Sequence, residues 1–270
     1  MFDSTMKTMA IPERVFALCQ VLKGGTISEE DAKKMFEPGT LAGNSPYFGA
    51  VRTAAEQIGL IETNADSKEI RLCVDKKIVE NMQSMRTYVN SKIETFSDGQ
   101  FYKTTRTWMH NSGELFNVDK DLQSVSKMVG ILNKYDPDLK LDEDSMRAWR
   151  FWSSFLGFGY LHDMFFMPNA ATYLWDSIKN SGIKTKKIYT ITDFFESLQP
   201  FTNICLSDDE ISKRKMNFAV SNAMRTLNDL GVIELKYVND REDEWNLTPM
   251  PLHAFSSLVT DVEYKGDKIA

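Results

Sequence analysis

The residue types best suited to binding a ligand gather around a predicted helix over residues 216–230. Six polar residues precede this helix or lie opposite its apolar stripe: Lys213, Arg214, Lys215, Asn217, Ser221 and Arg225. Ammonium and guanidinium groups pair with phosphates, and amide or guanidinium groups hydrogen-bond to base edges in the major groove of DNA. These six residues are therefore the leading candidates for contact with double-stranded DNA.

Acidic residues near this helix favour a different interpretation. Asp208, Asp209 and Glu210 precede the three cations, and the predicted turn over residues 240–244 carries four acids and one base. Any amphipathic helix also has a solvated polar face. The same six residues could thus form a solvated face or a surface that docks a protein.

The weaker candidates for DNA contact are Tyr47, Arg52, Arg147 and Arg150. Tyr47 directly precedes a predicted helix over residues 48–58, and Arg52 lies on that helix, where Glu56 opposes the one cation. The other two lie on the polar stripe of a helix over residues 146–156, whose many aromatic residues are expected to fill a core. Neither pair carries enough positive charge to neutralise a run of phosphates.

Catalytic motifs are absent from the sequence. It contains no glycine-rich phosphate loop, no dinucleotide-binding glycine pattern, no paired-histidine zinc motif and no nucleophile elbow. The three histidines, His110, His162 and His253, are far apart in sequence, and the acids and lysine at residues 261–265 lack the separated carboxylate of metal-dependent nucleases. We therefore expect no catalytic residue, no cofactor and no metal site.

A helix-and-hairpin pattern occurs twice and must position these candidates. Each copy is an apolar helix, a glycine and two short strands, and the copies cover residues 48–72 and 216–247. The glycines are Gly59 and Gly231, and the closing strand of the second copy is expected at residues 245–247. A helix that stops at glycine before a hairpin is typical of the closing half of a winged helix.

The middle of the chain repeats this pattern less clearly. The aromatic-rich helix over residues 146–156 is followed by Gly157 and by a short hairpin that ends before Pro168. This region is expected to be either a purely helical domain or a third, degenerate winged helix. Before it, apolar residues between positions 78 and 96 recur by three and four, which predicts one long helix.

These patterns together predict an α+β fold that is predominantly α. It would consist of tandem winged-helix domains flanking a helical, aromatic-rich middle, with boundaries at residues 1–75, 76–180 and 181–270. Ser28 and Ser207 are predicted helix N-caps, the latter in a capping box with Glu210. The residues beyond the second hairpin are expected to pack on the surface or to trail off.

Composition limits the possible partners of the chain. Its 270 residues carry a net charge of −6, which excludes a protein that coats nucleic acid through bulk positive charge. Its three cysteines, Cys19, Cys73 and Cys205, are expected to be buried, reduced thiols. With no apolar run long enough to span a bilayer and no signal sequence, the protein is expected to be cytoplasmic, without a membrane partner.

The sequence resembles the DpdG family, small proteins encoded in bacterial gene clusters that insert 7-deazaguanine derivatives into DNA and restrict unmodified DNA. The matching stretches are residues 14–18, 48–62, 150–159, 168–171 and 223–247. The resemblance implies a non-catalytic subunit of an anti-phage or DNA-restriction assembly, because similar proteins stand beside an ATPase partner. It transfers no catalytic residue.

The predicted function is therefore that of a non-catalytic adaptor subunit in a bacterial anti-phage defence complex. It would dock a larger ATPase, helicase or nuclease subunit from the same operon, with double-stranded DNA as a further partner. One alternative is a winged-helix transcription regulator, which would need a more basic recognition helix. Another is a tandem winged-helix adaptor of a chromosome-structuring ATPase, and the neighbouring genes would distinguish the two adaptor roles.

Overall fold

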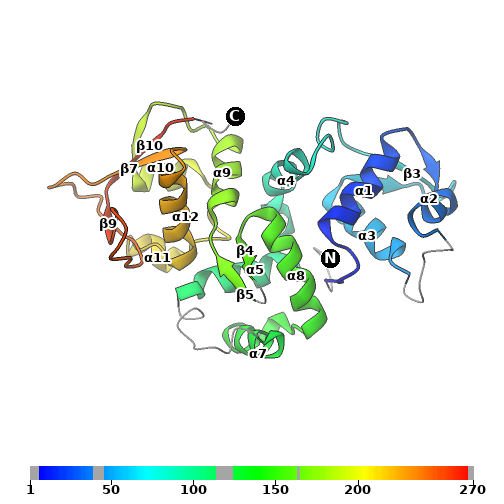
Figure 1. Cartoon of the computed structure of the whole chain (residues 1–270), viewed down its shortest axis with the longest axis horizontal. Helices are drawn as coiled ribbons and strands as arrows, with labels where there is room; N and C mark the ends of the chain where they lie inside the picture. The colour runs from blue at the N-terminus through cyan, green and yellow to red at the C-terminus, as the bar shows by residue number, and fades with distance from the viewer. Residues whose placement is uncertain (1–5, 39–45, 114–123, 163–164, 267–270) are drawn as a thin grey trace.

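Helices dominate the chain, and small antiparallel sheets lie toward its two ends in the computed structural model (Figure 1). The structure describes residues 6–38, 46–113, 124–162 and 165–266. About 49% of the described residues are helical and 13% are strand, so the expected mixture of predominant helix and minor sheet is present. The N-terminal helices and the last strands lie at opposite ends of an elongated molecule.

The N-terminal unit is a small helical domain closed by a three-stranded sheet. Its elements are α1 (Pro12–Leu22), β1 (Ile27–Ser28), α2 (Glu29–Phe36), α3 (Phe48–Ile58), β2 (Ile61–Thr63) and β3 (Glu69–Leu72), and the strand order is β1-β3-β2. Ser28 caps α2 by accepting from the Asp31 amide, as predicted. Gly59 ends α3 at φ 76°, a left-handed conformation that glycine adopts without steric cost.

The middle region is helical and ends in a two-stranded hairpin. Its elements are α4 (Met82–Ser91), η1 (Ile93–Phe96), α5 (Gln100–His110), α7 (Val125–Tyr135), η3 (Pro137–Leu139), α8 (Glu143–Leu156), β4 (Gly159–His162) and β5 (Phe165–Pro168). The prediction of one long helix from residue 78 to residue 96 is wrong. Asn81 starts α4 as its N-cap, accepting from the Ser84 amide, and such a local side-chain bond competes with helix continuation.

The C-terminal unit repeats the strand order of the first unit. Its elements are α9 (Ala171–Asn180), β6 (Ile188–Thr190), α10 (Ile191–Ser197), α11 (Asp208–Ser212), α12 (Phe218–Asp229), β7 (Ile233–Lys236), β8 (Trp245–Asn246), β9 (Leu258–Val259) and β10 (Asp261–Tyr264), with a sheet ordered β6-β10-β7. Ser207 and Glu210 form the predicted capping box at α11.

The C-terminal strands correct two sequence predictions. The strand that pairs with β7 is β10, whereas β8, predicted as the closing strand, pairs with β9 in a separate two-stranded sheet. Residues after the hairpin were expected to trail off, yet β10 is the central strand of its sheet and Val262 is fully buried. A 24-residue connection, residues 237–260, thus separates β7 from β10.

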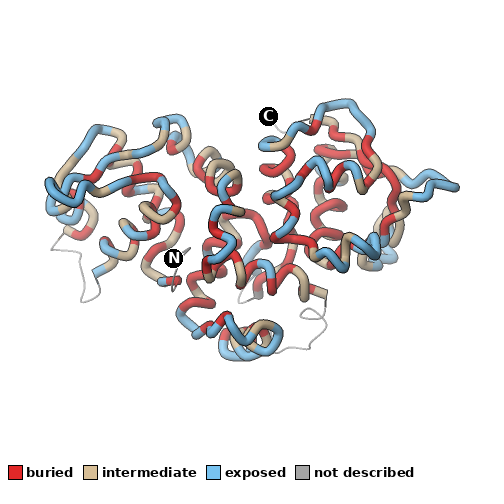
Figure 2. The backbone as a smooth tube through the Cα atoms, turned by 180° about the vertical axis from the view of Figure 1, so that it is seen from behind, coloured by how far each residue is buried: buried red, intermediate tan, exposed pale blue. Residues whose placement is uncertain are grey.

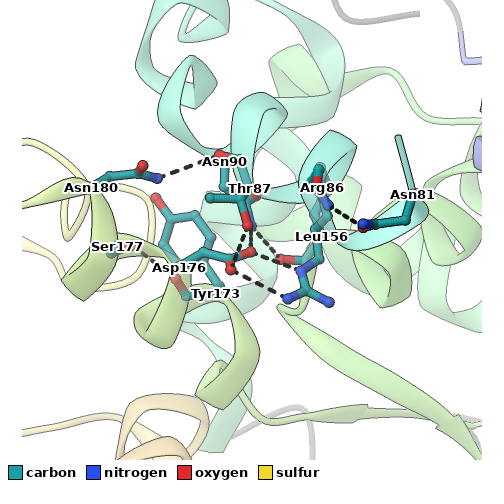
Figure 3. A network of polar contacts seen from close by, with 10 residues as sticks. Asn81, Arg86, Thr87, Asn90, Leu156, Tyr173, Asp176, Ser177 and Asn180 are labelled. Carbon is teal, nitrogen blue, oxygen red and sulfur yellow. Dashed lines mark hydrogen bonds and ion pairs between the residues drawn. The ribbon is translucent and has the colours of Figure 1, made fainter. Parts of the chain in front are cut away.

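A buried polar network joins the middle region to the C-terminal unit (Figure 3). Asp176 of α9 is 1% exposed and accepts hydrogen bonds from three side chains of α4. The Arg86 Nε lies 2.7 Å from Asp176 Oδ2, the Thr87 hydroxyl 2.9 Å from Oδ1 and the Asn90 amide 2.9 Å from Oδ2. A buried carboxylate satisfied in this way fixes α9 against α4.

Buried segments run through the middle region (Figure 2). Trp149 and Trp152 lie in its core, as expected from their spacing, whereas Phe151 is 43% exposed. Trp108, Trp149 and Phe166 contact one another with ring centroids 4.8 to 5.8 Å apart. Trp152 donates to the Ala10 carbonyl at 2.6 Å and so connects α8 to the start of the N-terminal unit. The buried hydrophobic residues accordingly form one continuous cluster from Met6 to Tyr264.

The thiols and helix lengths complete the comparison with sequence expectations. Cys19 and Cys205 are buried and free, as predicted, but Cys73 is exposed just after β3 and the prediction of its burial is wrong. Cys73 follows β3, the central strand of the sheet, and the alternation of sides along this strand turns it outward. Every helix within the described ranges is too short or too polar to cross a bilayer.

Candidate functional site

The three predicted cations that precede α12 lie in the link between α11 and α12. Lys213 pairs with Asp209 at 2.8 Å, and the Arg214 guanidinium bonds the Glu242 carbonyl and approaches Asp243 at 3.5 Å. Lys215 is exposed, and its ammonium forms no ion pair with any described residue. Two of the three positive charges are thus neutralised within the protein.

The prediction that Asn217, Ser221 and Arg225 face solvent is wrong. They are 7%, 0% and 3% exposed, respectively. Asn217 is the N-cap of α12, since its side-chain oxygen accepts from the Val220 amide and its nitrogen donates to the Cys205 carbonyl at 2.7 Å. Its amide is therefore engaged in folding and offers no edge to a base.

Residues 245–257, here called the strap, cover the outward face of α12. The Ser221 hydroxyl accepts from the Thr248 amide at 2.8 Å. Arg225 donates to three strap carbonyls, those of Phe255 at 2.9 Å, Thr248 at 2.7 Å and Ser256 at 3.0 Å. A guanidinium group has five N–H donors in a planar fork, so one Arg side chain can organise a whole loop.

The strap is also anchored at its first residue and near its tip. Trp245 is 1% exposed, donates to the Thr192 hydroxyl at 3.0 Å and packs on Phe195 with ring centroids 5.1 Å apart. His253 lies 3.1 Å from the Asp229 carboxylate near the end of α12. The face of α12 that would enter a DNA groove is consequently an internal surface.

Helical spacing could not predict that the strap covers α12, but the composition of this helix indicated that it is buried on several sides. Periodicity assigns one apolar stripe to α12, whereas its buried residues are Ala219, Val220, Ser221, Ala223, Met224, Arg225 and Leu227. Small and apolar residues on several sides of a helix indicate a helix surrounded by protein. Arg225 is the single arginine on that otherwise weakly charged stripe, and it holds the strap in place.

Among the described residues, no segment like the strap covers the face that holds the N-terminal candidates. Arg52 of α3 pairs with Glu29 and lies 3.8 Å from Glu56, so the one cation meets two acids. Tyr47 donates its hydroxyl to the Phe36 carbonyl. These contacts hold α2 against α3. They also engage the Arg52 guanidinium and the Tyr47 hydroxyl, the groups proposed for phosphate contact.

A carboxylate occupies the N-terminus of α3, where winged structures often hold a phosphate. Glu37 is 8% exposed and accepts from the amides of Tyr47 and Phe48. A helix N-terminus favours an anion there, and Glu37 supplies it from within the chain. Beside it lies a hollow of about 570 Å³ whose lining includes Lys7, Lys33 and Arg52.

The candidates in the middle region, Arg147 and Arg150, also have structural roles. Arg147 pairs with Glu143 at 2.6 Å and with Asp144 at 2.9 Å along the first turns of α8. Arg150 is 9% exposed, and burial, with a smaller effect of Arg147, lowers its pKa. Neither guanidinium projects as an isolated cation toward solvent.

Comparison with known proteins adds nothing to these structural observations. No protein-family model, no curated protein and no solved structure matches the chain. The geometry brings Lys213, Arg214 and Lys215 together beside an acidic segment, buries Asn217, Ser221 and Arg225, and keeps Tyr47, Arg52, Arg147 and Arg150 in separate parts of the molecule.

Proposed function

We propose that the chain is a non-catalytic adaptor built from winged-helix units. Both terminal units run helix, strand, helix, helix, strand, strand, and in both the last strand lies between the other two. This order supports two winged helices, the second with α11 and the 237–260 connection inserted. The middle region, with α5, α7, α8 and the β4-β5 hairpin, would be a third unit, in which the described residues between α5 and α7 include no counterpart of the first strand.

The observation that carries the adaptor role is the covered face of α12. A DNA reader presents polar side chains of this helix to base edges, but here Ser221 and Arg225 bind the strap. A winged helix whose reading face is closed retains its other surfaces for protein contact. Protein docking therefore fits this unit better than sequence-specific recognition of DNA.

An exposed apolar patch near the end of α12 supports a protein partner. Leu252 at the strap tip is 101% exposed, Leu230 is 49% exposed and Met250 is 36% exposed. The His253–Asp229 contact brings the strap tip and the end of α12 together. Apolar side chains on a firmly held loop lose little entropy when they enter a partner's pocket, and such residues often dominate binding energy.

The resemblance to the DpdG family indicates which kind of protein that partner is. In this proposal it is an ATPase, helicase or nuclease subunit encoded in the same operon, and the complex acts in bacterial anti-phage defence by restricting DNA. The adaptor would contribute binding and positioning, while its partner would supply catalysis.

Co-expression of the tagged chain with its neighbouring genes tests the proposal. We expect recovery of a stoichiometric complex with one large subunit, measured by mass photometry. Leu252→Glu should weaken that complex, whereas Met35→Glu, at another exposed apolar residue, in α2 at the other end of the molecule, should not. A chain recovered alone from every combination would refute the adaptor role.

DNA enters this proposal as a secondary partner, through the link before α12. Lys215 is exposed and forms no ion pair with a described residue, and Lys213 and Arg214 directly precede it. We expect the free chain to bind duplex DNA only at low salt, because few phosphates are neutralised. Reversal of all three residues to Glu should abolish the fluorescence-anisotropy change, and unchanged binding would remove this segment from the proposal.

A further inference from the structure

A cavity of about 340 Å³ lies where the middle region meets the C-terminal unit. It is lined by His110, Gly113, Glu210, Lys215, Asn217, Phe218, Thr248 and Pro249. These residues come from the end of α5, from α11, from the start of α12 and from the strap. A molecule bound here would touch every element that closes the C-terminal unit against the middle region.

His110 contributes its imidazole ring to the wall of this cavity. Its ring bonds the Asn203 backbone, while its Nε2 is buried and receives no hydrogen bond from any described residue. Burial, and then the nearby Arg106, lowers the pKa of His110 to about 4. The imidazole is therefore neutral at physiological pH, and with Nδ1–H donated to Asn203, Nε2 carries the free lone pair.

Two side chains of opposite charge complete the polar lining. Glu210 keeps one carboxylate oxygen on the amide and hydroxyl of Ser207, and burial raises its pKa. Lys215 is close enough to act electrostatically on Glu210, yet the two form no ion pair within the described residues. Arg106 and Asp208 also act on His110 and balance each other in charge.

We propose that this cavity binds a small zwitterion with a primary ammonium group and a carboxylate, the class that includes free amino acids. The ammonium group pairs with Glu210 and lies beside the His110 ring, and the carboxylate pairs with Lys215. Phe218 and Pro249 supply apolar contact for the carbon chain. A pocket of this size suits a ligand smaller than a typical drug. This site is independent of the proposed adaptor function.

Nuclear magnetic resonance of the histidine rings tests the site directly in the full-length protein. The chain has three histidines, so His162 and His253 serve as internal controls. The probes are glycine, L-alanine and 4-aminobutyrate, with methylamine and acetate as molecules that carry only one of the two charges. We expect at least one zwitterion to shift the His110 ring resonances alone, and methylamine and acetate to bind at least about tenfold more weakly.

Two variants separate binding from folding. Lys215→Met changes an exposed side chain and should weaken the zwitterion at least about tenfold while leaving the folded spectrum intact. His110→Phe should abolish binding measured by calorimetry. The proposal is overturned if no zwitterion shifts the His110 resonances, or if Lys215→Met binds like the wild type. It is also overturned if acetate or methylamine binds as tightly as the zwitterions.

Discussion

The N-terminal and C-terminal units share one strand order but treat their third helix in opposite ways. In the first unit, α3 keeps an outward face on which Arg52 meets Glu29 and Glu56. In the second, the strap lies over α12, and Arg225 holds it through three carbonyls. The strand order β1-β3-β2 recurs as β6-β10-β7, so the difference arises from the connection between the last two strands.

This difference shows that repeated apolar positions specify a scaffold and leave its surfaces undetermined. In the first unit only a short turn separates β2 from β3, whereas residues 237–260 separate β7 from β10. The longer connection reaches back over α12 and turns its polar stripe into an interior one. A cation on a third helix can accordingly be a surface group in one copy and a structural clamp in the other.

The largest expected effect comes from removing the clamp. Arg225→Met leaves three strap carbonyls without their donor and should lower the free energy of unfolding by about 3–5 kcal/mol. The matched Arg52→Met in the first unit removes partly exposed ion pairs and should cost at most about 1 kcal/mol. Urea denaturation followed by tryptophan fluorescence measures both, and equal losses would contradict the distinction between clamp and surface cation.

The glycines that end the third helices offer a second comparison. A Cβ at Gly157 would lie 2.5 Å from Thr172 Cβ and 2.7 Å from the Tyr173 nitrogen, whereas at Gly59 the nearest atom is 3.9 Å away. Both have positive φ. Gly157→Ala should cost about 2–4 kcal/mol, and Gly59→Ala about 1–2 kcal/mol from backbone strain alone. Thermal denaturation checks the order, and a larger loss at Gly59 would contradict it.

The Asp176 network provides a third effect, at the junction of the C-terminal unit with the middle region. Asp176→Asn removes the charge that holds Arg86 and should destabilise the protein by about 2–3 kcal/mol. Asp144→Asn, in an exposed pair with Arg147, should change stability by less than about 0.5 kcal/mol. If chemical denaturation gives similar values for both variants, Asp176 does not act as a buried tie between α4 and α9.

An effect of similar size depends on pH. Because burial lowers the pKa of His110 from 6.5 to about 4, the unfolded chain binds a proton in this range that the folded chain does not. Stability should therefore fall as pH is lowered through this window, by about 2–3 kcal/mol in total. His110→Asn should lack this component, so the difference between the two denaturation curves isolates it. Parallel curves would contradict a buried neutral imidazole.

Local signals in the sequence predicted local structure well. The caps at Ser28 and Ser207 and the helix end at Gly59 depend on neighbouring residues, and all three are confirmed. The position of β10 depends on pairing with β6 and β7, residues far away in sequence, and helical or strand periodicity does not encode such pairing. For this reason, local patterns predict that the C-terminal residues pack on the surface or trail off, although β10 is the central strand of its sheet.

The candidate site shows the same limit. Lys213, Arg214 and Lys215 were predicted as a cluster and do lie together, because they are neighbours in the chain. The burial of Ser221 and Arg225 follows from the strap, more than twenty residues away, and Asn217 is held by the Cys205 carbonyl; a helical wheel contains neither contact. His110 was judged an isolated histidine because its cavity partners Glu210 and Lys215 come from another unit.

Hydrogen exchange of the free, full-length chain tests the central claim that the strap closes α12. The account predicts slow exchange at Leu247, Thr248 and Met250, whose amides donate to Ser257, Ser221 and Ser256, with rates that approach those of α12. Arg225→Met should accelerate exchange in the strap more than in β2 and β3. Exchange of the wild-type strap within seconds, at the rate of an open loop, would show that α12 presents its polar face to solvent and would contradict the account.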